Sequence, residues 1–421
     1  MADWRNWSGS VSAHPRAIAS PQTEVELQRL VREAERVRVA GSGHSFMPLC
    51  ETDGLLISLL DMQGGIDIAP DRTRAWVPAG MPIGALTAAL WDEGLSLANQ
   101  GDIDKQAIAG ALSTATHGTG RTLGALSTFA TAYRLVLADG SVVECDAQRE
   151  TDLFQAQRVS LGAFGVATRI EIAVTPAYRL RETLRRVPVA ELLEGWDALA
   201  DAHRHVEFFT FPYADEALLK ILEPVEEGDD RPGADIESGA LQLICDLTRW
   251  IPPLAGPLQR MITKAMGSAT RAAPAYRIFP SERPTKFEEM EYELPAAAGA
   301  GALRAAIAEV RKRRFPIIFP FEYRTVAADD IWLSPMSGRD CISISFHQYA
   351  KMPWREPFAA IEGVFAEHGG RPHWAKRHTL TSEDVLRLYP DAPRWGEERK
   401  RIDPSAKFLN AHLRDLFAFS L

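Results

Sequence analysis

The sequence has few cysteines, and none of them lies in a group. The 421 residues include only Cys50, Cys145, Cys245 and Cys341, with no C-x-x-C or C-x-H spacing. Structural zinc sites need such groups, and disulfide frameworks need a cysteine-dense chain. We therefore expect no metal site and four reduced thiols.

Long apolar runs and basic blocks are also missing. No stretch reaches the roughly 18 apolar residues of a membrane-spanning helix, and the start, MADWRNW, is not a basic and then apolar leader. A net charge of −9 without a basic block argues against nucleic acid and anionic membranes as partners. These features together predict a cytoplasmic protein.

The composition that is present, 46% hydrophobic and 24% charged, is typical of a globular protein, and the length allows two domains. Glycine density falls near Pro176, and aromatic strands such as 206–213 follow a different pattern. We predict a first domain at 1–176 and a second that starts at 177. The acidic stretch 226–233 is expected to be a solvated loop.

A strand that leads into a glycine turn is the first candidate site. Val37 and Val39 alternate with arginines, and Gly41-Ser42-Gly43 follows, then His44 and Ser45. Such a turn brings bare backbone amides close to an anion, which suggests a pyrophosphate cradle with a nucleophilic imidazole beside it. A tight turn followed by a surface histidine is the alternative. His44 and Pro48 interrupt a G-x-G-x-x-G pattern, so a Rossmann fold is not favoured.

A second stretch is rich in glycine and small hydroxyl residues. It contains Gly101, Gly110, Ser113, Thr116, His117, Gly118 and Gly120. These residue types let backbone and hydroxyl atoms approach a large planar ligand and its phosphates. Two such clusters, each with a histidine, favour a nucleotide site, although ordinary turns around a short helix would give the same composition.

Periodicity predicts the elements around these clusters. Helices are expected at 21–35, 82–94 and 302–313, and strands at 54–59, 74–80, 133–138, 141–145, 161–172, 319–326 and 341–349. Asp139-Gly140 predicts a hairpin turn. A short helix should follow the proline turn near 404.

Three segments of the second half carry possible chemistry. Glu322 and Arg324 share one face of a strand, since side chains two apart point the same way. Ser345 and His347 share a face of the next strand, and Lys376 lies among histidines and aromatics. A structural ion pair, a satisfied core histidine and an exposed loop lysine are the alternatives; a pocket for a hydroxyl-rich ligand is the functional interpretation.

Six motifs together resemble the aldonolactone and alditol oxidoreductases, a branch of the vanillyl-alcohol-oxidase group of FAD enzymes. They are Gly41-Ser42-Gly43-His44-Ser45, 161–166 (LGAFGV), Glu322-Tyr323-Arg324, Leu333-Ser334-Pro335, His373-Trp374-Ala375-Lys376 and 403–410 (DPSAKFLN). The resemblance covers nearly the whole chain. It implies an α+β, two-domain, PCMH-type FAD-binding fold, in which an antiparallel-sheet cap at 177–398 covers the flavin and 399–421 returns to the first domain.

The resemblance also implies roles for the glycine clusters. His44 would be bonded covalently to the 8α-methyl group of FAD, and Gly41, Ser42, Gly43 and Ser45 would cradle its pyrophosphate. Residues of the second cluster, namely Gly110, Ser113, Thr116, His117, Gly118 and Gly120, would line the cofactor from the other side. Gly165 and Val166 would hold the adenine end.

On the substrate side the resemblance implies that Glu322, Arg324 and Lys376 are catalytic and that Asp102, Ser345 and His347 contact substrate. A substrate carbon would lose a hydride to flavin N5. Gly101 has no side chain to shield the flavin from oxygen, which favours an oxidase that makes hydrogen peroxide over a dehydrogenase.

The substrate class is less constrained. His-Trp-Ala-Lys is similar to the animal gulonolactone oxidases, whereas 322–329 (EYRTVAAD) resembles the alditol type. Ser345 and Asp102 depart from the alditol type, so we expect L-gulono-, L-galactono- or D-arabinono-1,4-lactone, with polyols second. A flavin carrier without turnover and an NADPH-fed reductase are further alternatives. We expect a monomer.

Overall fold

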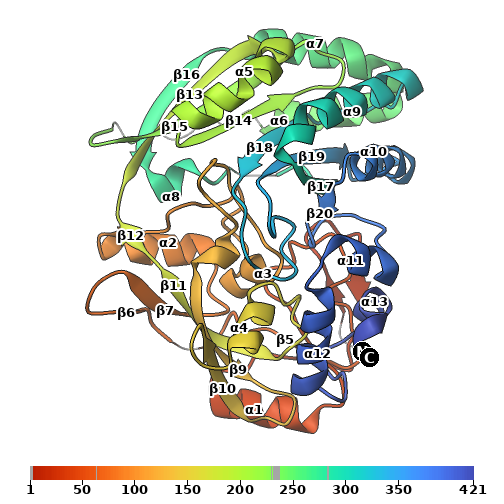
Figure 1. The fold of residues 1–421 in the computed structure, drawn as a ribbon. Coiled ribbons are helices and arrows are strands. Elements are labelled where there is room, and N and C mark those ends of the chain that lie inside the picture. Colours follow the sequence, from red (N-terminus) through yellow and green to blue (C-terminus); the bar gives the residue numbers. More distant parts are fainter. Residues whose placement is uncertain (1–2, 63, 229, 231–237, 282–283) are drawn as a thin grey trace.

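Two sheet regions, built from different parts of the chain, lie one above the other (Figure 1). The computed structural model describes residues 3–62, 64–228, 230, 238–281 and 284–421. Strands β3 to β12 belong to the lower region, and the eight-stranded sheet that begins with β13 forms the upper region.

The lower region contains an antiparallel and a parallel sheet. The antiparallel sheet has the order β10 (Val142–Asp146), β9 (Ala130–Val136), β11 (Val166–Ala173), β7 (Arg74–Pro78) and β6 (Asp67–Ile68). The parallel sheet has the order β3 (Ala17–Ala19), β5 (Leu55–Ile57) and β4 (Val37–Val39). Their helices are α1 (Glu24–Glu33), α2 (Ile83–Asp92), α3 (Ile108–Ser113) and α4 (Thr151–Arg158). Two short strand pairs are β1 (Trp4–Arg5) with β2 (Ser12–Ala13) and β8 (Leu95–Ser96) with β12 (Thr175–Pro176).

Local sequence signals explain where these elements begin and end. Helix α1 begins after Thr23, whose side chain accepts the amide of Glu26, and it buries Leu27 and Val31. Gly140 takes a φ of +83° in the turn between β9 and β10, a conformation that glycine adopts at little cost. The helices expected at 21–35 and 82–94 are confirmed with shorter bounds, and the strands expected before residue 146 are confirmed with ends that differ by up to three residues.

The upper region is one antiparallel sheet with helices packed around it. Its strand order is β16 (Ala269–Pro274), β13 (Arg179–Pro188), β15 (Glu216–Val225), β14 (His205–Thr210), β18 (Phe321–Val326), β19 (Cys341–Tyr349), β17 (Phe287–Pro295) and β20 (Arg371–Pro372). The accompanying helices are α5 (Val189–Ala202), α6 (Ser238–Trp250), α7 (Ala255–Ala265), α8 (Ala275–Ile278), α9 (Gly299–Arg313) and α10 (Arg355–Glu367). Strands β18 and β19 and helix α9 confirm three further expectations; the expected loop 226–233 lies partly outside the described residues.

Alternation along the central strands gives this sheet two different faces. Tyr323 and Ile344 pack under the helices, in a hydrophobic cluster with Trp196 and Leu303. The intervening side chains of the same strands point to the other face, which meets the lower region (Figure 1). That inner face is polar and lies at the junction of the two regions.

The end of the chain lies beside the lower region (Figure 1). Helices α11 (Ser382–Leu388), α12 (Ala392–Ile402) and α13 (Ala411–Leu416) follow β20. Trp374, Trp395 and Phe417 share a hydrophobic cluster with Leu135 and Ile170 of the lower sheet. The chain therefore runs into the upper region and back. The domain boundaries 1–176, 177–398 and 399–421 stay predictions.

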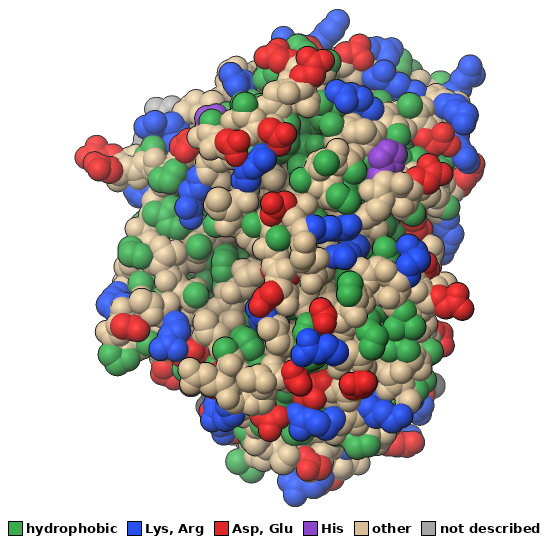
Figure 2. Space-filling model, viewed as in Figure 1, with side chains coloured by type: hydrophobic (Ala, Val, Ile, Leu, Met, Phe, Trp, Pro, Cys, Tyr) green, Lys and Arg blue, Asp and Glu red, His purple; other side chains and the backbone are tan. Residues whose placement is uncertain are grey.

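The surface, the helices and the cysteines add three observations. Figure 2 shows acidic and basic side chains interspersed over the visible face. Within the described residues, no helix combines the length and apolar character that crossing a membrane requires. All four cysteines are free thiols, as expected.

Candidate active site

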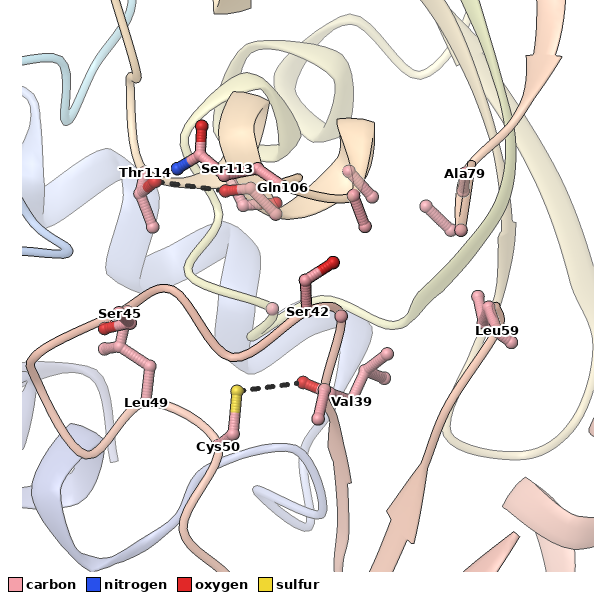
Figure 3. Close-up of a pocket in the computed structure, with 18 of the residues that line it drawn as sticks. Val39, Ser42, Ser45, Leu49, Cys50, Leu59, Ala79, Gln106, Ser113 and Thr114 are labelled. Carbon is pink, nitrogen blue, oxygen red and sulfur yellow. Dashed lines mark hydrogen bonds between the residues drawn. The ribbon is translucent and has the colours of Figure 1, made fainter. Parts of the chain in front are cut away.

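A long cavity lies in the lower region between the segments 38–45, 106–114 and 157–167. Its empty space is ≈ 1030 Å³, with open solvent at its mouth included. In Figure 3 the 39–50 segment lies below the cavity, Ser113 and Thr114 lie above it, and Leu59 and Ala79 close one side. The first cluster that the sequence singled out thus faces Gly110 and Ser113 of the second across one space.

Several glycines line this cavity, and at two of them no larger residue fits. A Cβ on Gly41 would lie 2.8 Å from the Cβ of Ala107, and one on Gly165 would lie 2.7 Å from the carbonyl oxygen of Val136. Gly43 and Gly165 also take positive φ values of +72° and +153°. These glycines leave the backbone of the wall without side chains, as an anion-binding turn requires.

A buried arginine, Arg38, lies under the same turn, and the sequence interpretation missed it. Its guanidinium donates to the carbonyl oxygens of Leu49 (2.7 Å), Leu161 (2.8 Å) and Gly162 (3.0 Å), and also to Phe408. Burial lowers its pKa to about 10, so it stays charged at neutral pH. Arg36 and Arg38 both alternate with valines in the sequence, and this pattern does not indicate that one of the two arginines is buried.

His44 lines the cavity and stacks on Trp7, with ring centroids 5.7 Å apart. Burial, and after it Lys376, lower its pKa to about 4, against a smaller opposite effect of Asp104. The imidazole is therefore neutral at physiological pH and keeps a nitrogen lone pair, which is what a nucleophile or a covalent attachment point needs.

The His44 end of the cavity touches the segment that carries Lys376. The amide of Phe46 donates to the carbonyl oxygen of Ala375 at 2.7 Å, and Ala375 itself lines the cavity. The Lys376 ammonium lies 5.4 Å from the centroid of the Phe46 ring. The predicted cradle and the predicted catalytic lysine are thus adjacent, although 330 residues separate them.

Three buried glutamates of β17 form the centre of the polar face, and the sequence interpretation missed them. Glu289, Glu291 and Glu293 pair in register with His347, Ser345 and Ser343 of β19. Their signal was present in the segment 287–295, FEEMEYELP, where glutamate recurs at every second position between Met, Tyr and Leu. Alternation of this kind predicts a strand with one charged and one apolar face.

The glutamates hold the predicted catalytic cations. Arg324 Nη2 donates to Glu291 Oε1 at 2.6 Å and to Ser345 Oγ at 3.0 Å, and lies 3.3 Å from Glu322. Lys376 Nζ lies 2.5 Å from Glu289 and 3.9 Å from Glu291. Lys376 is therefore a mostly buried member of this cluster rather than an exposed loop residue.

The charges of the cluster are fixed by mutual pairing. Burial alone would raise the pKa of Glu289 and Glu291, but nearby cations outweigh it. Lys376 and His347 bring the pKa of Glu289 to about 2, and Arg324 and His117 hold that of Glu291 well below its ordinary value. Both carboxylates stay ionised at neutral pH, so they orient cations and do not deliver protons.

His117 bridges the two regions as a buried cation. Its Nδ1 lies 2.8 Å from the carbonyl oxygen of Gly118, and its Nε2 lies 3.2 Å from both Glu291 and Glu293. Burial lowers its pKa, but the two carboxylates outweigh burial and raise it to about 10. Because every partner is an acceptor, both ring nitrogens carry hydrogen. The ligand atoms of this trio lie within 4.8 Å, close enough for a metal ion, but protonated His117 already supplies the positive charge.

Asp102 faces the same cluster from the lower region. Burial lowers the pKa of Arg324 and of Lys220, but nearby carboxylates outweigh burial and raise both pKa values. Glu291 has the largest such effect on Arg324 and Glu207 the largest on Lys220. The carboxylate of Asp102 adds to both. Its backbone carbonyl accepts the amide of Ser281 from the upper region at 3.0 Å. The residues predicted to contact substrate, Asp102, Ser345 and His347, therefore surround Arg324 and Glu289.

The structure separates the predicted cofactor residues into two groups. Those that line the cavity are Gly41, Ser42, Gly43, His44, Ser45, Gly110, Ser113 and Gly165; those outside its lining are Gly101, Thr116, His117, Gly118, Gly120 and Val166. Val166 packs in a hydrophobic cluster with Phe408. Gly101 and Gly118 instead form the loops beside His117. The roles of both groups stay predictions.

Two family models match the chain in succession. One described as an FAD binding domain matches residues 15–146, and one described as D-arabinono-1,4-lactone oxidase matches residues 170–416. With the fold and the cavity above, these matches define an FAD-dependent oxidoreductase. Since the second model spans more than half of the chain, the chain belongs to the D-arabinono-1,4-lactone oxidase family.

Relatives of known name align over almost their full length. The chain is 39% identical to the L-gulono-1,4-lactone dehydrogenase of Mycobacterium tuberculosis, over 98% of each chain. It is 27% identical to the L-gulonolactone oxidase of Mus musculus and 29% identical to an alditol oxidase of a Streptomyces species, each over 98% of both chains. Cholesterol oxidase from B. sterolicum shares the fold, with a TM-score of 0.83 at 17% identity over 99% of this chain and 96% of that one. The predicted α+β, two-domain FAD-binding fold is confirmed.

The cavity fits FAD on three observations. Gly41, Gly43, Gly110 and Gly165 leave its wall without side chains, so a large ligand can approach the backbone there, and Arg38 adds a buried positive charge, as a pyrophosphate needs. Gln157 lines the cavity while its buried Oε1 has no hydrogen-bond partner among the described residues. An unpaired buried acceptor is costly, so it suits a ligand that donates a hydrogen bond.

Proposed function

We propose that the protein oxidises a carbinol carbon of a sugar 1,4-lactone, of the L-gulono-, L-galactono- or D-arabinono- type, with FAD as cofactor. The observation that carries the proposal is the buried Arg324 and Lys376 pair, held by Glu291 and Glu289 at the His44 end of the cofactor cavity. A protein that only stored flavin would not need this cluster, which burial makes expensive unless every charge is paired.

The lower region would hold the cofactor. Gly41, Ser42, Gly43 and Ser45 would contact the pyrophosphate, and neutral His44 would form a covalent bond to the flavin. When bound, FAD accepts a hydride from the substrate carbon and passes the electrons to oxygen, which gives hydrogen peroxide. The covalent bond would keep the cofactor in place through each cycle.

Arg324 would position the substrate. Its Nη2 is fully engaged, but its buried Nε has no hydrogen-bond partner among the described residues. That donor is free for a hydroxyl or carbonyl oxygen of the lactone, and Lys376 would offset negative charge that develops nearby. Glu322 would accept the hydrogen bond of the hydroxyl that loses its proton.

A lactone is favoured over a polyol by two residues and by similarity. Asp102 and Ser345 stand where the alditol type differs, and the relative at 39% identity is named for a gulonolactone. An alditol remains the second candidate because of the 322–329 segment. The same relative is named a dehydrogenase, so a non-oxygen acceptor is the alternative to oxygen; Gly101, which has no side chain, favours oxygen.

The test combines a pigment assay with a substrate panel. Acid precipitation should leave the yellow chromophore with the protein and with a peptide that contains His44, whereas His44→Ala should release it. Anaerobic mixing with lactones and polyols should reduce the flavin fastest with a lactone, and aerobic mixing should then produce peroxide.

Lys376→Met should slow flavin reduction about 100-fold or more while FAD stays attached, because a pre-positioned cation is lost from the site. Lys312→Met, which removes an exposed lysine on α9, is the matched control and should leave the rate unchanged. Equal reduction by the Lys376 variant, or reduction by no member of the panel, would refute the proposed function.

A further inference from the structure

The segment 241–266, which we call the α6–α7 segment, carries large apolar side chains on the outside of the molecule. The exposed fractions are 70% for Leu243, 76% for Trp250, 47% for Ile251 and 56% for Met261. Single exposed apolar residues are ordinary, but neighbouring ones mark an interaction surface. This segment is independent of the cofactor cavity and of the proposed function.

Helix α6 is anchored by its other face. Cys245 is buried in a cluster with Ile318, Tyr349 and Met352, and Leu241 and Ile244 pack against it. Leu243, Leu247 and Trp250 recur at i, i+4 and i+7 and therefore point outward together. A helix that is apolar on both sides is normally covered on both. Within the described part of the chain, the outer stripe stays exposed.

The net charge of −9 argues against anionic membranes for the chain as a whole, but the charge of the α6–α7 segment is opposite to it. The segment holds the bases Arg249, Arg260 and Lys264 and one acid, Asp246, whereas the chain as a whole carries −9. Asp246 accepts a hydrogen bond from Tyr349 and lies 3.8 Å from Lys351, so its charge is already balanced. The three bases are exposed, and no described carboxylate forms an ion pair with them.

We propose that the α6–α7 segment binds the surface of an anionic lipid bilayer, with both helices in the plane of the interface. Trp250 and Ile251 lie at the turn between the helices, and tryptophan favours the headgroup level. Arginine and lysine stems can cover apolar surface while their charges meet lipid phosphates. The negative charges elsewhere on the chain are screened beyond about 10 Å at ordinary salt.

A second copy of the chain is a poorer occupant on the same observations. A two-fold dimer pairs a patch with itself, so the net positive charge of this segment would meet an equal positive charge of the partner. An anionic surface has the complementary charge instead. The charge of the segment therefore selects lipid over self-association.

The test is sedimentation of the FAD-loaded full-length protein with vesicles. Phosphatidylcholine vesicles with 30% phosphatidylglycerol, about as anionic as a charged leaflet, should pull down the wild type, and pure phosphatidylcholine vesicles should bind it about tenfold less. The double variant Leu243→Ser/Trp250→Ser should lose roughly tenfold or more of the anionic binding. The double variant Arg260→Glu/Lys264→Glu should bind the anionic vesicles only as weakly as the wild type binds the neutral ones.

Val25→Ser is the matched control, because Val25 is 75% exposed on α1 in the lower region. It should bind as wild type, and all variants should keep wild-type flavin absorbance per chain, which shows that they fold. Absence of binding to anionic vesicles, or equal binding by the Leu243/Trp250 variant, would overturn the proposal. So would a concentration-dependent dimer, seen by light scattering, that this variant abolishes without any vesicle binding.

Discussion

At the scale of single residues, Glu291 is the point where the polar cluster is joined. It accepts hydrogen bonds from Arg324 and from Ser343 Oγ (2.7 Å) and pairs with His117, so it touches groups from both regions. It does not line the cavity, but among the predicted site residues it also lies 3.9 Å from Lys376 and opposite Ser345 in the strand register. Its role is therefore to position Arg324 and to keep His117 charged.

Glu291→Gln tests this positioning role. The amide keeps the shape but removes the charge that orients Arg324, so kcat should fall about 10- to 100-fold, and the KM should change less, because binding contacts remain. Stopped-flow flavin reduction and steady-state rates measure the two effects, and Glu291→Asp should restore part of the rate.

Glu288→Gln provides the control for Glu291→Gln. Glu288 is equally buried on β17, but it pairs with Arg377 at 2.7 Å and points to the opposite face of the strand. Its loss should lower stability without slowing flavin reduction. Equal slowing by both variants would mean that Glu291 acts only through stability.

At the scale of elements, the alternation of side chains between the two faces of a strand was the most accurate sequence signal. Period two placed Glu322 with Arg324, and Ser345 with His347, on one face, because the side-chain direction follows from the backbone alone. The partners of these residues could not be predicted, since the contact of Lys376 with Glu289 depends on how β20 and the following loop lie beside β17. The burial of Arg38 likewise depends on three carbonyl-bearing segments that are distant in sequence.

The loop that ends in His117 shows the same limit. Its glycines predicted a ligand-binding turn, but their nearest neighbours are other loops. A Cβ on Gly118 would lie 2.4 Å from the carbonyl oxygen of Gln100, and one on Gly101 would lie 3.1 Å from the carbonyl oxygen of His117. These glycines are needed at least for loop-on-loop packing, which composition alone does not distinguish from ligand contact.

Two alanine substitutions separate packing from oxygen access in these loops. Gly118→Ala forces backbone apart and should lower the thermal midpoint by several degrees, the size expected for a change of about 2 kcal/mol or more. Gly101→Ala needs only a few tenths of an ångström and should change the midpoint less, yet slow flavin reoxidation by oxygen and spare reduction. Differential scanning fluorimetry and oxygen-mixing kinetics measure these effects, and unchanged reoxidation in Gly101→Ala would discard the shielding idea.

At the scale of the whole molecule, short polar contacts connect the two regions around the site. Thr119 Oγ1 donates to the carbonyl oxygen of Val206 at 2.7 Å, and the amide of Gly120 donates to that of Thr325 at 2.8 Å. His117 adds the charged contact to Glu291 and Glu293. The 116–120 loop therefore joins the cofactor-binding region to β14, β17 and β18, and the ionisation of His117 should affect how firmly the regions hold together.

The pH dependence of stability follows from the sign of that pKa shift. His117 has a folded pKa of about 10 against an ordinary value of 6.5, so between these values the folded chain keeps a proton that the unfolded chain releases. Its stabilising contribution is complete below pH 6.5, declines as pH rises and is lost above 10. The decline is at most ~1.4 kcal/mol per pH unit for one proton. Urea unfolding from pH 6.5 to 9.5 should show a shallower decline in His117→Gln than in wild type.

His14→Gln is the control for that comparison, because His14 lies on the surface beside Asp3 and its loss should leave the wild-type slope intact. Groups that titrate near pH 9 and above affect all three proteins alike and cancel in the difference. Histidine NMR of the wild type at pH 8 gives a second measurement, since one ring should show two bound protons when free histidines are neutral. Parallel unfolding curves for wild type and His117→Gln, with only neutral rings in the spectrum, would mean that Glu291 and Glu293 do not hold a charged imidazole between the two regions.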